Sequence, residues 1–157
     1  MSIYESLLSS PMLLNEQIAL EVFAAMPDGE LLVVICDEKG NYWASDQCRF
    51  SKVISDRQEL ERICTTIMDG CDPVIHEVDD CTIVATQLDA ERANCGCLFL
   101  VLPAYTRQST LANMEVIELL LSQLNLVARL IEKNNQLHRM QLRYLNDSAS
   151  NCPQTVA

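Results

Sequence analysis

Four cysteines and one histidine in the middle of the sequence could in principle bind a metal ion: Cys71, His76, Cys81, Cys95 and Cys97. Structural zinc sites use four thiolate or imidazole ligands, usually in closely spaced pairs. The spacings here match no paired-cysteine motif. A strand would also direct successive side chains to opposite faces. We therefore expect no metal site and interpret the cysteines as reduced thiols that pack as small hydrophobic side chains.

Thiol redox chemistry is a second reaction that cysteines can support. Cys95 and Cys97 would share one face of an apolar strand, where thiols stay protonated and unreactive. We therefore keep a thiol-dependent redox enzyme only as the least favoured alternative function. The sequence has no motif for a nucleophile with its base, for paired acid and base groups, or for a phosphate-binding loop. Its 4 glycines are too few for a glycine-rich loop, and we expect neither enzymatic activity nor a cofactor.

Hydrophobic periodicity predicts the elements that would position these residues. A first helix is predicted from Pro11 to Met26, with Ser10 as its N-cap. A second follows the capping box Ser55-Asp56-Arg57-Gln58 and stops at Gly70. Tyr42 and Trp43 should point to opposite faces of their strand. Strands are predicted over Leu31–Cys36, Asn41–Ser45, Pro73–Val78, Cys81–Leu88 and Gly96–Leu102, and loops over Asp46–Ile54 and Asp89–Asn94.

The last apolar run, Ser109–Leu145, is predicted to be a single helix roughly 50 Å long, capped by Gln108, Ser109 or Thr110. Its first half is apolar on more than one face and should pack both on its own domain and on a partner. Its second half carries one stripe with the spacing of a coiled coil. Two polar members of the stripe, Asn134 and Gln141, would fix its register. We therefore predict a homodimer whose interface comprises Leu120, Leu124, Val127, Leu130, Asn134, Leu137, Gln141 and Tyr144.

Composition narrows the function classes further. A chain of 157 residues is long enough for one domain with its own core plus an appendage. The net charge of −11 argues against nucleic-acid binding and against an anionic membrane surface. No apolar run is long enough to span a bilayer. The first ten residues lack the basic region of a secretory signal, so we expect a cytoplasmic protein.

Three segments together resemble the GAF domain, a relative of PAS sensor domains. Asp69-Gly70-Cys71-Asp72-Pro73-Val74 is similar to the family's helix end and entry into the third strand. Cys95–Leu102 is similar to its last strand, and Met114–Leu120 with its continuation to its closing helix. The resemblance covers about Glu16–Arg139. It divides the chain into an extension (1–10), a GAF-like domain (11–126), a coiled-coil extension (127–146) and a disordered tail (147–157).

The resemblance implies an α+β fold with a five-stranded antiparallel sheet in the order 2-1-5-4-3 and the terminal helices on one face. It also implies a non-catalytic sensory or regulatory role in bacterial-type signal transduction, with a downstream signalling partner. In the family the other face of the sheet holds a small-molecule pocket, covered by the segment between strands two and three, which is short in this sequence. For aromatic residues near that pocket, packing at the sheet edge is the more ordinary role. The residues placed at this ligand site are Tyr42, Trp43, Arg49, Phe50 and His76.

The same order of elements also fits the roadblock family of small dimeric scaffolds, whose members bind no ligand. In that family the third helix is short. The stripe from Leu130 to Tyr144 therefore favours the sensory interpretation over the scaffold. The volume of any pocket on the sheet should distinguish the two, because a sheet face filled by side chains leaves no room for a ligand.

Overall fold

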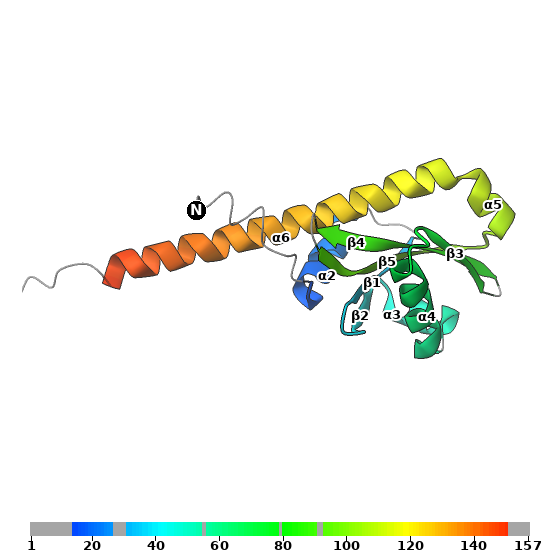
Figure 1. The fold of residues 1–157 in the computed structure, drawn as a ribbon, viewed down its shortest axis with the longest axis horizontal. Helices are drawn as coiled ribbons and strands as arrows, with labels where there is room; N and C mark the ends of the chain where they lie inside the picture. Colours follow the sequence, from blue (N-terminus) through cyan, green and yellow to red (C-terminus); the bar gives the residue numbers. More distant parts are fainter. Residues whose placement is uncertain (1–13, 27–30, 55, 79, 91–92, 151–157) are drawn as a thin grey trace, which may run out of the picture.

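The computed structural model describes residues 14–26, 31–54, 56–78, 80–90 and 93–150 of the chain (Figure 1). Within these ranges the chain forms one sheet with helices on both of its faces. A long C-terminal helix crosses the sheet and projects beyond it. The elements are α2 (Glu16–Ala25), β1 (Leu32–Asp37), β2 (Tyr42–Ala44), α3 (Gln47–Val53), α4 (Arg57–Met68), β3 (Val74–Val78), β4 (Cys81–Ala90), β5 (Ala93–Pro103), α5 (Arg107–Ala112) and α6 (Met114–Ser150).

The five strands lie in the order β2-β1-β5-β4-β3, and every neighbouring pair is antiparallel. This arrangement confirms the predicted α+β fold and strand order. β5 is central, as expected from its uninterrupted apolar run. It pairs with β1 from Leu32↔Val101 to Asp37↔Gly96, and with β4 along its other edge.

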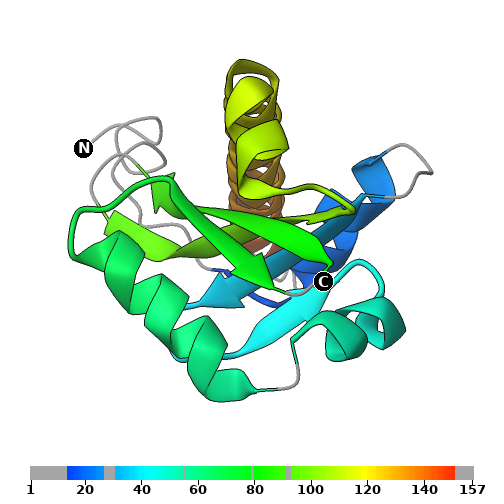
Figure 2. The ribbon, with the colours of Figure 1, turned by 90° about the vertical axis from the view of Figure 1, so that its right-hand side faces the viewer.

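Each face of the sheet has its own core because side chains alternate along a strand. Leu98 and Leu100 pack beneath α2 and α6, whereas Phe99 and Val101 pack beneath α3 and α4. Figure 2 shows α3 and α4 on one side of the sheet and α6 on the other. The terminal helices thus share one face, as predicted. Tyr42 and Trp43 contact different cores, which confirms their predicted opposite directions.

The segment predicted as the loop Asp46–Ile54 contains the helix α3, so that prediction is wrong. Asp46 caps the helix by accepting a hydrogen bond from the backbone N–H of Arg49 at 3.1 Å. Phe50 is the fully buried residue of the helix and anchors it on the sheet. One buried residue in seven is too weak a periodic signal to predict a helix from sequence.

Two helix starts differ from the predictions. Asn15, rather than Ser10, caps the first described helix, and its side chain accepts a hydrogen bond from the N–H of Ile18. Asn15 has extended backbone angles, so a continuous helix from Pro11 is ruled out. The cap of α4 is Asp56. The predicted caps Ser10 and Ser55, and the predicted turn at 27–29, lie outside the described residues.

The polar segment Asp89–Asn94, predicted as a loop, belongs largely to the sheet. β4 extends to Ala90 and β5 begins at Ala93, with a register shift between Leu88 and Asp89. Strand formation here follows from continued backbone pairing and needs no buried side chains. The hydrophobic pattern, which ends at Leu88, therefore underestimated the length of this hairpin.

The predicted single helix Ser109–Leu145 is two helices. Thr106 caps α5 in a capping box with Ser109, and α5 ends at Ala112, before Asn113, whose backbone is not helical. Asparagine competes for backbone hydrogen bonds and is a weak helix former. The short α5 forms the corner at which the chain reverses onto the sheet (Figure 1). α6 then continues to Ser150, so the predicted disorder is wrong for residues 147–150. The rest of the predicted tail lies outside the described residues.

Within the described residues, no helix has both the length and the apolar character needed to cross a membrane.

Candidate functional site

The first half of α6 is held on the sheet by a stripe of buried side chains. Ile117, Leu121, Leu124 and Ala128 belong to the core that α2 shares. The stripe ends at Glu132, whose side chain is only 1% exposed. The helix is therefore anchored as far as Glu132, six residues beyond the boundary predicted at 126. Leu124 and Leu120, both predicted for a dimer interface, are buried in this core or packed against it.

A second apolar stripe runs along the opposite side of α6. Successive helix residues turn by about 100°, so Leu130 lies about 200° from the buried Ala128. Exposure is 58% for Leu130, 41% for Leu137 and 72% for Tyr144. We call this set the outer stripe. Its exposed apolar members are Val116, Leu119, Leu126, Leu130, Leu137 and Tyr144.

The outer stripe includes three of the predicted interface residues and adds others. Val127 is partly exposed, and Asn134 and Gln141 are exposed beside it. Val116, Leu119 and Leu126 were not predicted. The sequence contains their spacing of three and seven residues. It does not indicate which apolar face of the first half of α6 packs on the sheet.

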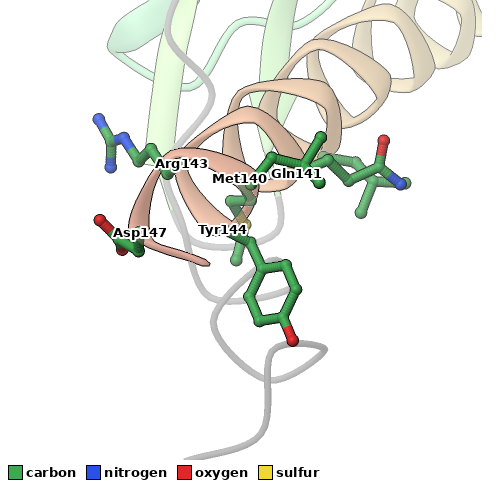
Figure 3. A pocket seen from close by; sticks show the side chains of 7 residues that line it. Met140, Gln141, Arg143, Tyr144 and Asp147 are labelled. Atoms are coloured by element: carbon green, nitrogen blue, oxygen red, sulfur yellow. The ribbon is translucent and has the colours of Figure 1, made fainter. Parts of the chain in front are cut away.

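The end of α6 carries a hollow of about 810 Å³. Its described lining consists of seven residues from this one helix, including Leu137, Met140 and Tyr144. Figure 3 shows the Tyr144 ring directed away from the helix, on a different side from Arg143 and Asp147. The described lining alone, all from one helix, does not enclose a ligand and is mostly an exposed surface of α6.

A smaller pocket, of about 320 Å³, lies where α4 crosses the ends of β1 and β5. Three cysteines from three elements line it: Cys36, Cys64 and Cys97. Cys36 and Cys97 are directly opposite each other in the β1–β5 ladder. Cys64 belongs to the inward-facing stripe of α4, beside Leu60 and Ile63. We call these three residues the thiol cluster.

The three thiols of the cluster contact one another. The neighbouring Cys36 and Cys97 thiols lower the pKa of Cys64. The same contacts, together with burial, raise the pKa of Cys36 and of Cys97. The carboxylates of Asp37 and Asp72 add to these two increases. Cys64, which is partly exposed, is therefore the thiol that ionises first.

Glycine is required beside the cluster. A Cβ atom on Gly96 would lie 1.9 Å from the carbonyl oxygen of Cys36, and the φ of Gly96 is 144°. Side chains other than hydrogen are therefore excluded where β1 and β5 approach each other. This close approach positions Cys97 opposite Cys36.

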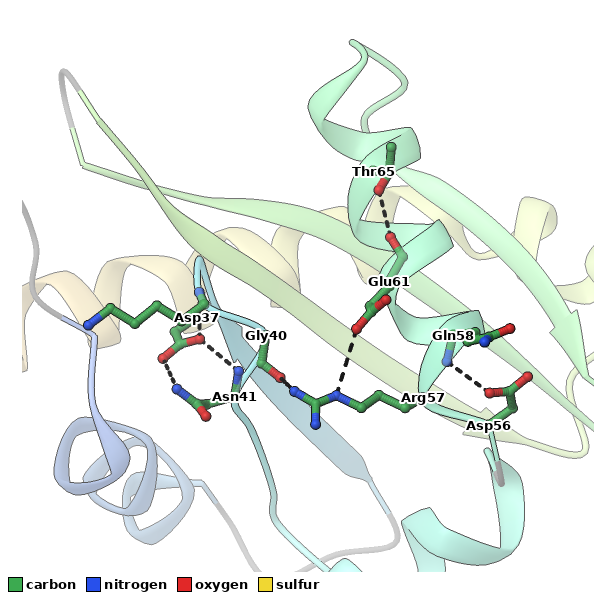
Figure 4. Close-up of polar contacts among 9 residues, drawn as sticks. Asp37, Gly40, Asn41, Asp56, Arg57, Gln58, Glu61 and Thr65 are labelled. Atoms are coloured by element: carbon green, nitrogen blue, oxygen red, sulfur yellow. Dashed lines mark hydrogen bonds and ion pairs between the residues drawn. The ribbon is translucent and has the colours of Figure 1, made fainter.

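The rim of the pocket is fixed by polar contacts between α4 and the β1–β2 turn (Figure 4). Arg57 donates to the carbonyl oxygen of Gly40 at 3.1 Å and lies 3.7 Å from a carboxylate oxygen of Glu61. Asp37 accepts hydrogen bonds from the backbone N–H groups of Lys39 and Asn41. These contacts hold the turn against the helix and keep the entrance to the thiol cluster in place.

The structure does not gather the five predicted ligand residues around one pocket. Tyr42 lines the thiol pocket, and its ring packs edge-on against buried Phe50 at a centroid distance of 5.5 Å. Trp43 contacts the core on the opposite face. Arg49 lines another pocket, of about 370 Å³. His76 pairs with Glu59 at 2.7 Å.

The residues considered for metal binding are also dispersed. Cys97 joins the thiol cluster, whereas Cys81 pairs with Pro103 at the far end of the same sheet face. Cys97 and Pro103 are six positions apart on β5, about 20 Å at the rise of a strand. Cys71 is exposed after α4. The side chain of Cys95 lies outside the described residues.

Between the two pockets, the sheet face beneath α3 and α4 is filled by side chains. Val34, Phe50, Ile63, Ile83 and Phe99 are all buried there. Among the described residues, pockets of about 370 Å³ and about 320 Å³ lie at the two ends of this layer. Their volumes are at the lower limit for small-molecule sites.

No family profile matches the sequence, and comparisons with characterised proteins and with solved structures give no significant match.

Proposed function

We propose that this chain is a non-catalytic, GAF-like sensory or regulatory domain that acts as a homodimer through α6. The observation that carries the proposal is the outer stripe, which lies opposite the side of α6 that packs on the sheet. Apolar side chains at heptad spacing along an exposed helix are typical of a coiled-coil seam. Because the domain occupies the other side of the helix, two copies could pair without contact between their sheets.

A dimer of this kind supplies a route for signalling. A change in the packing of α4 or the sheet would alter the position of α6, and a downstream partner would detect the altered pair of helices. Such coupling needs two helix arrangements with different affinities for the signal. We propose that Asn134 and Gln141 limit the seam to one register.

The test is the oligomeric state of the full chain. Leu130→Lys/Leu137→Lys places two charges in the proposed seam and should convert a dimer into a folded monomer in sedimentation equilibrium. Leu142→Lys is the matched control: Leu142 is also exposed on α6, but about 140° around the helix from Leu137. The control should leave the dimer intact. A wild-type chain that is monomeric at high micromolar concentration would contradict the proposal.

A ligand-free dimeric scaffold of the roadblock type is the second candidate. The observation in its favour is the sheet face filled by Phe50, Phe99 and their neighbours. Native mass spectrometry of the purified chain distinguishes the two functions. A co-purified small molecule would support the sensor, and two chains without added mass would support the scaffold.

A further inference from the structure

We propose that Cys64 is a site of reversible oxidation by hydroperoxides, ending in a disulfide between Cys64 and one of the two sheet cysteines, Cys36 or Cys97. The thiol cluster has the three features that this chemistry needs: a nucleophilic sulfur, neighbouring thiols in contact with it, and an opening for the oxidant. Its members come from three elements, and nothing in the proposed dimer uses them. The proposal therefore stands whether or not the chain dimerises.

The nucleophile is the first feature. A thiolate attacks peroxides, whereas a protonated thiol does not. Cys36 and Cys97 line the same pocket as Cys64 and lower its pKa, which favours a negative charge on the Cys64 sulfur. These two thiols are themselves nearly fully buried and stay protonated. The cluster thus separates one reactive sulfur from two thiols that can resolve its oxidised form.

The reaction balances as two steps. The Cys64 thiolate attacks one oxygen of the hydroperoxide, the O–O bond breaks, and the alkoxide or hydroxide that leaves takes up a proton, giving a sulfenic acid on Cys64. Once Cys64 is a sulfenic acid it carries no negative charge, so Cys36 or Cys97 can give up its proton and attack the Cys64 sulfur as a thiolate. The S–O bond of the sulfenic acid breaks as the disulfide forms, and the departing hydroxide takes up the proton and leaves as water. Two thiols are oxidised by two electrons, and one hydroperoxide is reduced to an alcohol or water.

A disulfide within the sheet itself is the less favourable product. Backbone hydrogen bonds from Asp37 to Asn41 and from Ser45 to Val33 show that odd-numbered residues of β1 bond to β2. Cys36 therefore occupies a hydrogen-bonded position opposite Cys97, where Cβ atoms are about 5.5 Å apart. A disulfide needs roughly 3.5–4.5 Å between Cβ atoms. Cys64, on a helix packed over both, can approach either one.

Access is provided by the pocket of about 320 Å³ that all three cysteines line. The pocket is large enough for a small hydroperoxide, and its lining carries charges of both signs: Lys39 and Arg57 beside Asp37, Glu38 and Glu61. Three thiols can also bind a soft metal ion. Within the described part of the chain, however, no group of His, Cys, Asp and Glu side chains is arranged to hold one.

The test uses the full chain, reduced and freed of reductant, then exposed to a small excess of hydrogen peroxide. Peptide mapping without reduction should identify a disulfide that contains Cys64. Cys36→Ala and Cys97→Ala should each still form one through the remaining partner. The double variant Cys36→Ala/Cys97→Ala should instead accumulate a sulfenic acid on Cys64 that dimedone traps.

Exposed Cys48 on α3 provides the control. Cys48→Ser should leave the disulfide yield unchanged, and Cys64 should be oxidised at least about tenfold faster than Cys48. Circular dichroism identifies any variant that fails to fold. Equal rates at Cys48 and Cys64, a disulfide that excludes Cys64, or a stoichiometric metal ion bound to the three thiols in the purified protein would each overturn the proposal.

Discussion

The two halves of α6 belong to one helix of 37 residues, about 55 Å long. The domain buries apolar side chains of the first half only. As far as Glu132 the helix buries side chains in every turn or two. Beyond Glu132, none of its described residues is buried. Both halves nevertheless carry apolar residues at regular spacing.

This contrast shows that helical periodicity predicts a buried face without telling what buries it. The domain itself buries Ile117, Leu121 and Ala128. For Leu130, Leu137 and Tyr144 the described part of the chain supplies no cover. An uncovered helix gains little stability from intrinsic propensity alone, and the partner helix proposed above would supply the missing burial.

Leu121 and Leu119 give the sharpest comparison, because they are neighbours on α6 that face opposite sides. Leu121→Ala should lower the free energy of unfolding by about 2–5 kcal/mol, since it leaves a cavity beneath the helix. Leu119→Ala should change it by less than about 0.5 kcal/mol when measured in the monomeric Leu130→Lys/Leu137→Lys background. Urea denaturation of both variants measures the difference. Equal losses would mean that Leu119 is also covered by its own chain.

The sheet was predictable because its strands carry clear signals. The apolar runs around Val34 and Phe99, the turn at Gly40 and the helix stop at Gly70 each have a local physical cause. α3 and the break at Asn113 were missed because a seven-residue helix and a single non-helical residue leave almost no periodic trace. The full length of the β4–β5 hairpin depends on backbone pairing, which side-chain patterns do not report.

The thiol cluster could not be predicted by searching for spaced motifs. Cys36, Cys64 and Cys97 are far apart in the sequence and meet only because β1 pairs with β5 and α4 crosses both. The strand order does predict that Cys36 and Cys97 are near each other. Their register, and hence direct opposition, follows only from the structure. The predicted ligand residues were dispersed for the converse reason: Tyr42 and Trp43 are adjacent in sequence but belong to opposite faces.

A smaller effect is expected at Asn134, which is exposed beside the outer stripe. Asn134→Leu replaces a polar seam residue by an apolar one and should tighten the proposed dimer about tenfold, or roughly 1.4 kcal/mol, while weakening its preference for two strands. Sedimentation equilibrium measures both. Asn135→Leu, the same change about 100° around the helix, is the control. If the two variants associate alike, Asn134 is not part of a seam.

The smallest predicted effect tests the boundary between the two halves. Glu132 is buried, and one of its carboxylate oxygens, Oε1, accepts a hydrogen bond from Gln136 at 2.7 Å and contacts half-exposed Arg139 at 3.4 Å. The other, Oε2, has no hydrogen-bond partner among the described residues. Burying a charged group with an unsatisfied oxygen costs free energy. Removing one partner of an ion pair is costly when the other stays buried, but half-exposed Arg139 can return to water.

Glu132→Leu should therefore raise the free energy of unfolding by about 1 kcal/mol at neutral pH. Glu118→Leu, the same change at an exposed position of α6, should alter it by less than about 0.5 kcal/mol. Thermal and urea denaturation in the monomeric background provide the measurement. A loss of more than 1 kcal/mol for Glu132→Leu would contradict this argument, because it would mean that the carboxylate is held by a favourable contact. Glu132 would then stabilise the end of the packed half of α6 instead of destabilising it.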